Sequence, residues 1–243
     1  MKSARSKPII RLVDVYKEYK VGSITTVALK GANFEVFARQ LIAIMGPSGS
    51  GKTTLLNMIG LLDRPTRGKI FFDAFDVSGL DDETLANLRN TKLGFVFQTF
   101  NLVNRLSVFE NVELPLIPRG IPRSVRVKMV KEALAEVGGE ESWFPKKPNQ
   151  LSGGQQQRVA IARAIVGKPV VLLADEPTGN LDRASAKIVV ETFLKLNKAG
   201  HTVVVVTHDP EVANCMEKIY TIRDGEIIGE IMPNKAEALI NKE

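Results

Sequence analysis

The sequence has almost no cysteine: Cys215 is the single one among 243 residues. One thiol cannot form a disulfide within the chain, so the fold does not depend on an oxidising compartment. The cytoplasm is therefore the expected location.

Long apolar runs are missing as well. A helix that crosses a bilayer needs about 20 consecutive apolar residues, whereas the purest apolar runs here include 170–174 and 203–206 and are far shorter. Residues 1–5 have the basic start of a signal peptide, but Arg11 and Asp14 interrupt the chain before an apolar region develops. We therefore expect neither a transmembrane segment nor secretion.

No charge of one sign dominates. The 33 basic and 27 acidic residues give a net charge of +6 and are dispersed along the chain. A solvated surface explains them as well as nucleic acid or anionic lipid would, so no nucleic-acid partner is expected. With 44% hydrophobic and 25% charged residues, the composition is that of an ordinary globule. At about 150 residues per domain, the length predicts one large domain or a core with a subordinate lobe.

Short β-rich runs alternate with helical ones, which is typical of an α/β protein with a sheet covered by helices. The continuously apolar runs are predicted as central strands buried on both faces of one mixed sheet. The first two and last two strands are expected to be antiparallel, and Asp224 with Gly225 predicts a hairpin in the last pair. The predicted strands are 9–13, 31–37, 41–45, 69–72, 93–97, 170–174, 202–206, 218–222 and 226–231.

Residues 100–149 have a different character. Five prolines surround a helical run at 124–137, in which apolar residues recur at spacings of three or four. This pattern predicts an inserted helical lobe.

One glycine-rich segment follows the predicted strand 41–45 and precedes a helical run at 54–60. It fits the phosphate-loop pattern G-x-x-x-x-G-K-[ST], in which successive backbone N–H groups surround a phosphate at the positive end of a helix. We assign Lys52 to the β- and γ-phosphates and the Thr53 hydroxyl to Mg²⁺. A purely structural glycine-rich turn is the alternative. The nucleotide-binding residues predicted here are Gly46, Pro47, Ser48, Gly49, Ser50, Gly51, Lys52, Thr53 and Thr54.

Two carboxylates, Asp175 and Glu176, end the apolar strand 170–174. This places them at the edge of the sheet where α/β proteins bind ligands. One carboxylate suffices for Mg²⁺, which we assign to Asp175, so Glu176 is the candidate base that activates the attacking water. A pair of surface acids that caps the next helix is the alternative.

A second candidate anion site lies at Ser152, Gly153 and Gly154, before a helical run at 156–166. Ser152 can cap the helix while the two glycine amides face outward, which suits a terminal phosphate. Taken alone, such a segment is more often a structural cap.

The order of these motifs resembles the nucleotide-binding subunit of an ATP-binding-cassette (ABC) transporter over residues 9–231. The Walker A loop lies at 46–53 and the Walker B strand ends at Asp175 and Glu176. The family's remaining motifs match Gln98, the signature 151–155 with Gln155, the D-loop 180–182 with Asp182, and the switch histidine His208.

The resemblance implies a head-to-tail homodimer in which each ATP lies between one subunit's Walker A loop and the other's signature. Ser152, Gly153, Gly154 and Gln155 would then act in trans, and Asp182 would cross the interface. Gln98 would approach Mg²⁺ and the attacking water. His208 would contact the γ-phosphate and hold the water against Glu176; an ordinary histidine at a strand end is the alternative.

The family's adenine-stacking aromatic matches Tyr19 in the first hairpin. A tyrosine face offers a large apolar area for stacking. Tyr16 is the competitor, since alternation along the strand decides which ring faces the nucleotide. Simple packing in the sheet is the alternative for either ring.

The resemblance further implies a P-loop NTPase (RecA-like) core with an antiparallel β subdomain and an inserted α-helical subdomain. The expected division is 1–99 with 160–231 for the first two, 100–159 for the helical subdomain, and a short tail at 232–243. The segments 97–102, 110–116 and 155–158 are similar to the subfamily of lipoprotein-release and macrolide-export systems. The expected function is an ATPase motor on the inner face of the membrane that drives a separate permease. A non-transport ABC ATPase and a regulatory ATPase of an envelope or cell-division complex are the alternatives.

Overall fold

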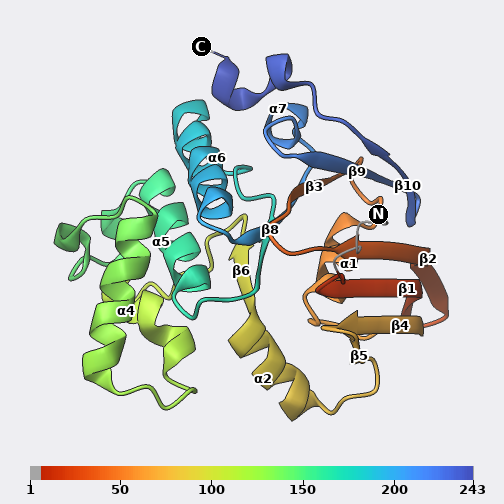
Figure 1. Ribbon diagram of the computed structural model, residues 1–243, viewed down its shortest axis with the longest axis horizontal. Coiled ribbons are helices and arrows are strands. Elements are labelled where there is room, and N and C mark those ends of the chain that lie inside the picture. The colour runs from red at the N-terminus through yellow and green to blue at the C-terminus, as the bar shows by residue number, and fades with distance from the viewer. Residues whose placement is uncertain (1–6, 243) are drawn as a thin grey trace, which may run out of the picture.

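The computed structural model describes residues 7–242 and forms two β-sheets with helices around them (Figure 1). The basic start at 1–5 and the last residue of the expected tail therefore lie outside the described residues. The predicted α/β class is confirmed, whereas the single mixed sheet is wrong, because the first strands form a sheet of their own.

The six-stranded sheet carries the centre of the molecule. Its strand order is β10 (Glu226–Ile231), β9 (Lys218–Arg223), β3 (Leu41–Met45), β8 (Thr202–Thr207), β7 (Val171–Asp175) and β6 (Leu93–Phe97). All neighbours are parallel except β9 and β10. That last pair is joined by the predicted hairpin, in which Asp224 and Gly225 have φ of 50° and 84°.

The four-stranded sheet is antiparallel, with the order β2 (Ile24–Val36), β1 (Ile10–Val21), β4 (Arg67–Phe72) and β5 (Phe75–Asp76). The predicted strands 9–13 and 31–37 are correct in position but too short. The outer part of this hairpin is exposed and polar, so it lacks the apolar alternation by which a strand is detected. Cross-strand hydrogen bonds extend the strands regardless.

The strands of the six-stranded sheet other than β10 send side chains to two separate cores. On β3, Leu41 and Ala43 belong to one buried cluster, while Ile42 and Ile44 belong to the other. The first cluster includes the helical part of the chain, and the second joins the sheet to α1 (Lys52–Ile59) and to the antiparallel sheet. The central sheet therefore holds both flanking layers in fixed positions.

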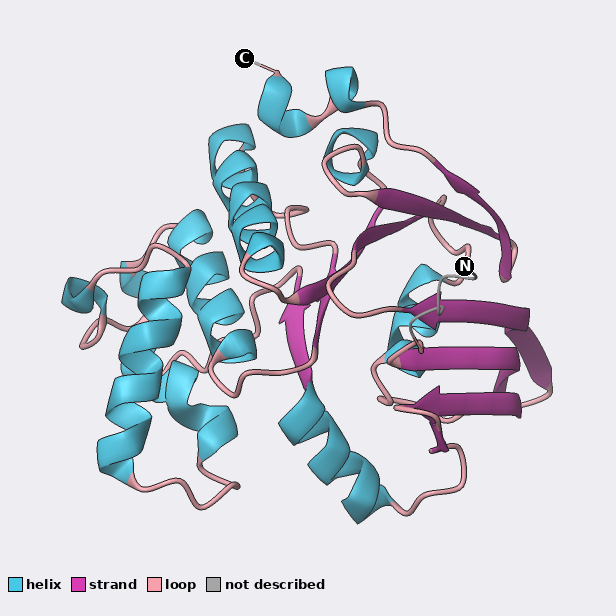
Figure 2. Cartoon of the chain, in the orientation of Figure 1, coloured by secondary structure: helices cyan, strands magenta, loops and turns pink. Residues whose placement is uncertain are grey.

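The helices gather mainly on one side of the molecule and the antiparallel strands on the other (Figure 2). Helices α3 (Val108–Glu113), α4 (Arg123–Glu136) and α5 (Gly153–Ile165) form the helical part. Helix α4 lies within one residue of the predicted helical run 124–137 at each end. The remaining helices are α2 (Asp82–Lys92), α6 (Arg183–Lys198) and α7 (Pro210–Ala213). Short 3₁₀ turns lie at Leu114–Leu116, Glu141–Trp143, Pro148–Gln150, Lys235–Glu237 and Leu239–Asn241. Within residues 7–242, no helix has both the length and the apolar character needed to cross a bilayer.

Helix α5 approaches strand β6 closely at Gly94. A Cβ added at Gly94 would lie 2.4 Å from the backbone oxygen of Ala164. A backbone atom cannot swing aside as a flexible side chain can, so only glycine fits. This contact sets the spacing between the C-terminal part of α5 and the start of β6.

We predict that Gly94→Ala lowers the free energy of unfolding by about 1–3 kcal/mol, the usual cost of overpacking a tight contact. Urea denaturation would measure the loss. Gly79→Ala is the matched control, because a Cβ there meets no atom within 4 Å. Equal stability of the two variants would contradict the close approach.

Candidate functional site

Four neighbouring parallel strands end at one edge of the six-stranded sheet, and each is followed by predicted site residues. The phosphate loop follows β3, His208 follows β8, Glu176 follows β7 and Gln98 follows β6. Because the carboxyl ends of adjacent parallel strands meet at the same edge, these residues are brought together.

Three glycines shape the phosphate loop for different reasons. Gly49 and Gly51 have φ of 77° and 101°, values that other L-residues rarely adopt. At Gly46 a Cβ would lie 2.2 Å from the backbone oxygen of Ile222. Helix α1 starts directly after the loop. Its N-cap residue is Gly51, so no side chain forms a capping hydrogen bond with the first amides. The first amides of α1 therefore have no competitor for an anion.

Lys52 lies folded back over its own loop. Its Nζ donates to the backbone oxygens of Gly46 at 2.8 Å and Pro47 at 2.9 Å, and the residue is only 8% exposed. A buried ammonium is thus already held at the phosphate loop.

Asp175 and Thr53 provide oxygen atoms that fit a hard divalent cation. The Thr53 hydroxyl donates to Asp175 Oδ2 over 3.3 Å, and the buried Oδ1 has no hydrogen-bond partner among the described residues. Burial raises the pKa of Asp175; the charge of Glu176 adds to this, while the Thr53 hydroxyl and Lys52 oppose it. A carboxylate oxygen that is buried and unpartnered beside a hydroxyl suits Mg²⁺, which prefers such ligands.

Glu176 and His208 form a pair. His208 Nδ1 lies 2.9 Å from Glu176 Oε1, and the His208 backbone N–H donates to Oε2 at 3.3 Å. Glu176 has φ of 45°, which costs a non-glycine residue about 1–2 kcal/mol. Its backbone N–H donates to the Val206 oxygen at 2.9 Å and so holds this conformation. Both carboxylate oxygens of Glu176 therefore have a fixed orientation.

Gln98 is held by Asn180, a partner that the sequence did not reveal. Gln98 Nε2 donates to Asn180 Oδ1 at 3.2 Å, and Asn180 Nδ2 donates back to the Gln98 backbone oxygen at 3.1 Å. A Cβ at Gly179 would lie 2.7 Å from Gln98 Nε2. The segment 98–102, here called the Gln98 loop, is thus joined to the segment that carries Asp182.

Ser152 caps α5, as the sequence predicts. Its Oγ accepts from the Gln155 N–H at 3.3 Å, and the Ser152 N–H donates to Gln155 Oε1 at 2.9 Å. Gly153 has room for a side chain, since the nearest atom to an added Cβ is a Leu181 methyl at 3.4 Å. Asp182 caps α6 through the Ser185 N–H at 2.9 Å.

The signature residues and the phosphate loop of one chain do not meet. Among residues 7–242 no hydrogen bond joins Ser152, Gly153, Gly154 or Gln155 to the phosphate loop, and α5 lies well apart from α1 in Figure 1. One chain therefore has two separate helix N-termini suited to anions.

Tyr19, rather than Tyr16, lies beside the phosphate-loop helix. The Tyr19 hydroxyl donates to Asp63 Oδ2 at 3.1 Å. Burial raises the pKa of Tyr19, a hydrogen bond with Thr54 opposes this, and Asp63 adds to it. Each ring has a cation over it: the Arg67 guanidinium lies 4.4 Å from the Tyr16 centroid, and Lys17 Nζ lies 4.9 Å from the Tyr19 centroid. The contacts of Tyr19 with Thr54 in α1 and with Asp63 favour Tyr19 as the stacking residue.

Asp63, which the sequence analysis did not single out, also accepts from Lys17 Nζ at 2.7 Å. Burial alone would raise the pKa of Asp63, but the hydrogen bonds from Lys17, the Arg64 backbone and Tyr19 outweigh it and lower that pKa. Asp63 lies 44 residues from Tyr19 in the sequence, so no local pattern indicates the contact.

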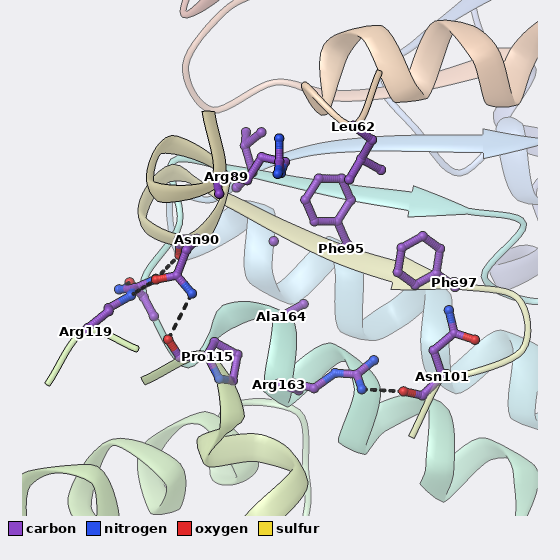
Figure 3. A pocket seen from close by; sticks show the side chains of 14 residues that line it. Leu62, Arg89, Asn90, Phe95, Phe97, Asn101, Pro115, Arg119, Arg163 and Ala164 are labelled. Atoms are coloured by element: carbon purple, nitrogen blue, oxygen red, sulfur yellow. Dashed lines mark hydrogen bonds between the residues drawn. The ribbon is translucent and has the colours of Figure 1, made fainter. Parts of the chain in front are cut away.

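A pocket of about 450 Å³ lies between α2, β6 and α5 (Figure 3). Its wall includes Leu62, Phe95, Phe97, Pro115 and Ala164, with arginines at the rim. The pocket lies between the central sheet and the helical part, next to the Gln98 loop.

The family model described as ABC transporter matches residues 29–179. An uncharacterized ABC transporter ATP-binding protein of Thermotoga maritima is 51% identical over 223 residues, which cover 92% of this chain and 95% of that protein. The macrolide export ATP-binding/permease protein MacB of Campylobacter fetus is 43% identical over 93% of this chain, which spans only 35% of MacB.

Two solved structures of MJ0796, an ABC transporter cassette of Methanocaldococcus jannaschii, match with a TM-score of 0.85 each. They are 47% and 46% identical and cover 93% of this chain and 99% of theirs. The first is described as dimeric, and the second as a dimeric post-hydrolysis state bound to ADP and Pi.

We predict that Tyr19→Ala weakens ATP binding by roughly 5- to 150-fold, because stacking of a base on an aromatic ring contributes about 1–3 kcal/mol. Affinity for inorganic triphosphate, which has no base, is expected to stay within about twofold. Fluorescence titration measures both. Tyr16→Ala is the matched control. A similar loss of ATP affinity in that variant would contradict the assignment of the stacking to Tyr19.

Proposed function

The chain belongs to the ABC transporter family, and we propose that it is the ATP-hydrolysing subunit of a transporter, forms a head-to-tail homodimer around two ATP molecules, and drives a separate transmembrane permease. One observation carries this proposal. The phosphate loop, the Asp175 carboxylate and the Glu176–His208 pair share one sheet edge, while the signature residues of the same chain, within 7–242, make no hydrogen bond to that loop.

The phosphate loop binds the nucleotide. Its amides and the buried Lys52 hold the β- and γ-phosphates, and the Tyr19 ring stacks on adenine. Thr53 and Asp175, with Gln98, hold Mg²⁺, which supplies charge neutralisation for the phosphate oxygens. The unpartnered Asp175 Oδ1 supports this assignment.

Glu176 accepts the proton of the attacking water. Its carboxylate is fixed by the His208 ring and backbone, so a water that binds to it has a defined direction towards the γ-phosphate. Positioning and electrostatic stabilisation account for most of the rate in such reactions. The His208 side chain is largely exposed and can contact the γ-phosphate at the same time.

The second anion-binding helix end explains the dimer. Ser152, Gly153 and Gly154 of one chain cannot serve the phosphate loop from which they are separated, but they complement the loop of a second copy. The dimeric MJ0796 structures support this arrangement, and the ADP- and Pi-bound form supports ATP hydrolysis. ATP then stabilises the closed dimer by contacting both halves, and hydrolysis releases it.

The pocket beside the Gln98 loop is the proposed docking site for the permease, on the inner face of the membrane. It is apolar in its wall, open, and formed by both the central sheet and the helical part, so an inserted helix contacts the two parts that meet there. The ATP-binding/permease relative MacB supports a permease partner and an export function of the macrolide or lipoprotein type.

We predict that Glu176→Gln keeps ATP affinity but lowers the hydrolysis rate by roughly 10²- to 10⁴-fold, the usual effect of losing a general base. The variant should also accumulate as an ATP-bound dimer, which size-exclusion chromatography detects. Glu217→Gln is the control, because this carboxylate accepts from Leu41 at the opposite end of β3. Near-normal turnover by Glu176→Gln would remove Glu176 from the role of base.

A mixing experiment tests whether the signature acts in trans. We expect Lys52→Ala and Gly153→Asp homodimers to be inactive: the first lacks the phosphate-binding ammonium, and the second has a carboxylate where the γ-phosphate binds. Gly153 has room for the new side chain. In a mixed dimer both defects fall in one site and leave the other intact.

An equal mixture should therefore recover up to about a quarter of the wild-type rate, because half of the dimers are mixed and each has one intact site. Phosphate release measures the recovery. A mixture no more active than either variant alone would mean that the signature serves its own chain.

A further inference from the structure

The Gln98 loop contains two consecutive residues in the left-handed conformation. Phe100 and Asn101 have φ of 59° and 51°, and neither is glycine. Phenylalanine resists this conformation, whereas asparagine adopts it more readily, and within the loop the Thr99 hydroxyl donates to Asn101 Oδ1 at 2.8 Å. The strain therefore falls mainly on Phe100, and contacts from outside the loop add to the local ones.

Arg163 on helix α5 provides these contacts. Its guanidinium donates to the Asn101 backbone oxygen at 2.5 Å and to the Phe100 backbone oxygen at 2.9 Å. Figure 3 shows the side chain reaching from α5 to Asn101 at one end of the pocket. A planar guanidinium can bind two neighbouring carbonyl groups at once, which fixes their relative orientation.

No acidic side chain among residues 7–242 forms an ion pair with Arg163, although fourteen such pairs occur in this part of the chain. Burial lowers the pKa of this arginine. Its N–H groups thus donate to the backbone oxygens of Phe100 and Asn101 instead of to a carboxylate.

We propose that Arg163 is a positioning residue for Gln98: by holding the left-handed Phe100–Asn101 turn from helix α5, it fixes the place of Gln98 beside the attacking water and Mg²⁺. This inference rests on the proposed function, which gives Gln98 its role at the active site.

Helix α5 holds this region at a second point. Gln157 is fully buried, and its Nε2 donates to the Phe97 oxygen at 3.3 Å and to the Pro177 oxygen at 2.7 Å. Asn180 holds the first residue of the Gln98 loop, and Arg163 holds the third and fourth. Because α5 also begins at the signature residues, a displacement of this helix reaches Gln98 through Arg163.

The test compares four variants of the full chain: Arg163→Ala, Arg163→Lys, Gln98→Ala and Arg158→Ala. Arg158 is the matched control, since it lies on the same helix, donates to a backbone oxygen, that of Gly138, at 2.7 Å, and is remote from the Gln98 loop. Amide hydrogen exchange of residues 97–102, the KM for ATP, the kcat and the midpoint of thermal unfolding are measured for each.

Arg163→Ala should raise exchange in residues 97–102 by about tenfold, because the turn opens locally. Its kcat should fall by roughly 10- to 100-fold, as expected for a misplaced active-site group, with KM within about threefold. Gln98→Ala should reproduce the fall in kcat. Arg163→Lys, which can reach one of the two carbonyls, should be intermediate. Arg158→Ala should change neither the exchange in this segment nor the kcat.

Unchanged exchange in residues 97–102 of Arg163→Ala would overturn the proposal. So would a normal kcat in that variant when Gln98→Ala is impaired, or an equal rise in exchange throughout the protein. If Gln98→Ala and Glu176→Gln both keep full turnover while the local exchange still rises, the proposed function fails and the holding of the loop by Arg163 stands.

Discussion

The site depends on one geometric constraint, which is that neighbouring parallel strands end at the same edge. Strands β3, β8, β7 and β6 lie side by side, so the residues that follow them must meet whatever their separation in the sequence. The two buried clusters on the faces of this sheet fix the strand ends in place. Asp175, Glu176 and His208 therefore have defined positions although each lies at a strand end or in a loop.

The same constraint leaves the signature outside the site. Ser152 caps a helix that packs against β6 through Gly94 and reaches the Gln98 loop through Arg163, but this helix lies apart from α1 and the phosphate loop of its own chain. The first amides of a helix favour an anion. In the proposed dimer, this helix end complements the phosphate loop of a second copy.

Local patterns in the sequence were sufficient for the parts of the site that are contiguous. The phosphate loop, the carboxylates after an apolar strand and the Ser152 cap each consist of a few consecutive residues, so each can be recognised in the sequence alone. The contacts of Asn180 with Gln98 and of Asp63 with Tyr19 span 82 and 44 residues, so no short pattern indicates them. The choice between Tyr19 and Tyr16 stayed open for another reason: register shifts in β1 between Leu12 and Glu18 break the alternation on which it depends. The outer strands were predicted too short because their exposed, polar residues carry no burial signal.

Three residues at this same edge, Glu176, Phe100 and Asn101, have a left-handed backbone and none is glycine. For Glu176 and Phe100 this conformation costs about 1–2 kcal/mol relative to an unstrained residue, whereas asparagine adopts it more readily. Their conformations persist because tertiary contacts hold them: Val206 holds Glu176, and Arg163 holds the other two. A group held in this way keeps its position only as long as the element that holds it stays in place. Small movements of β8 or α5 therefore act directly on Glu176 and on Gln98, and through these contacts closure of the proposed dimer can reach both residues.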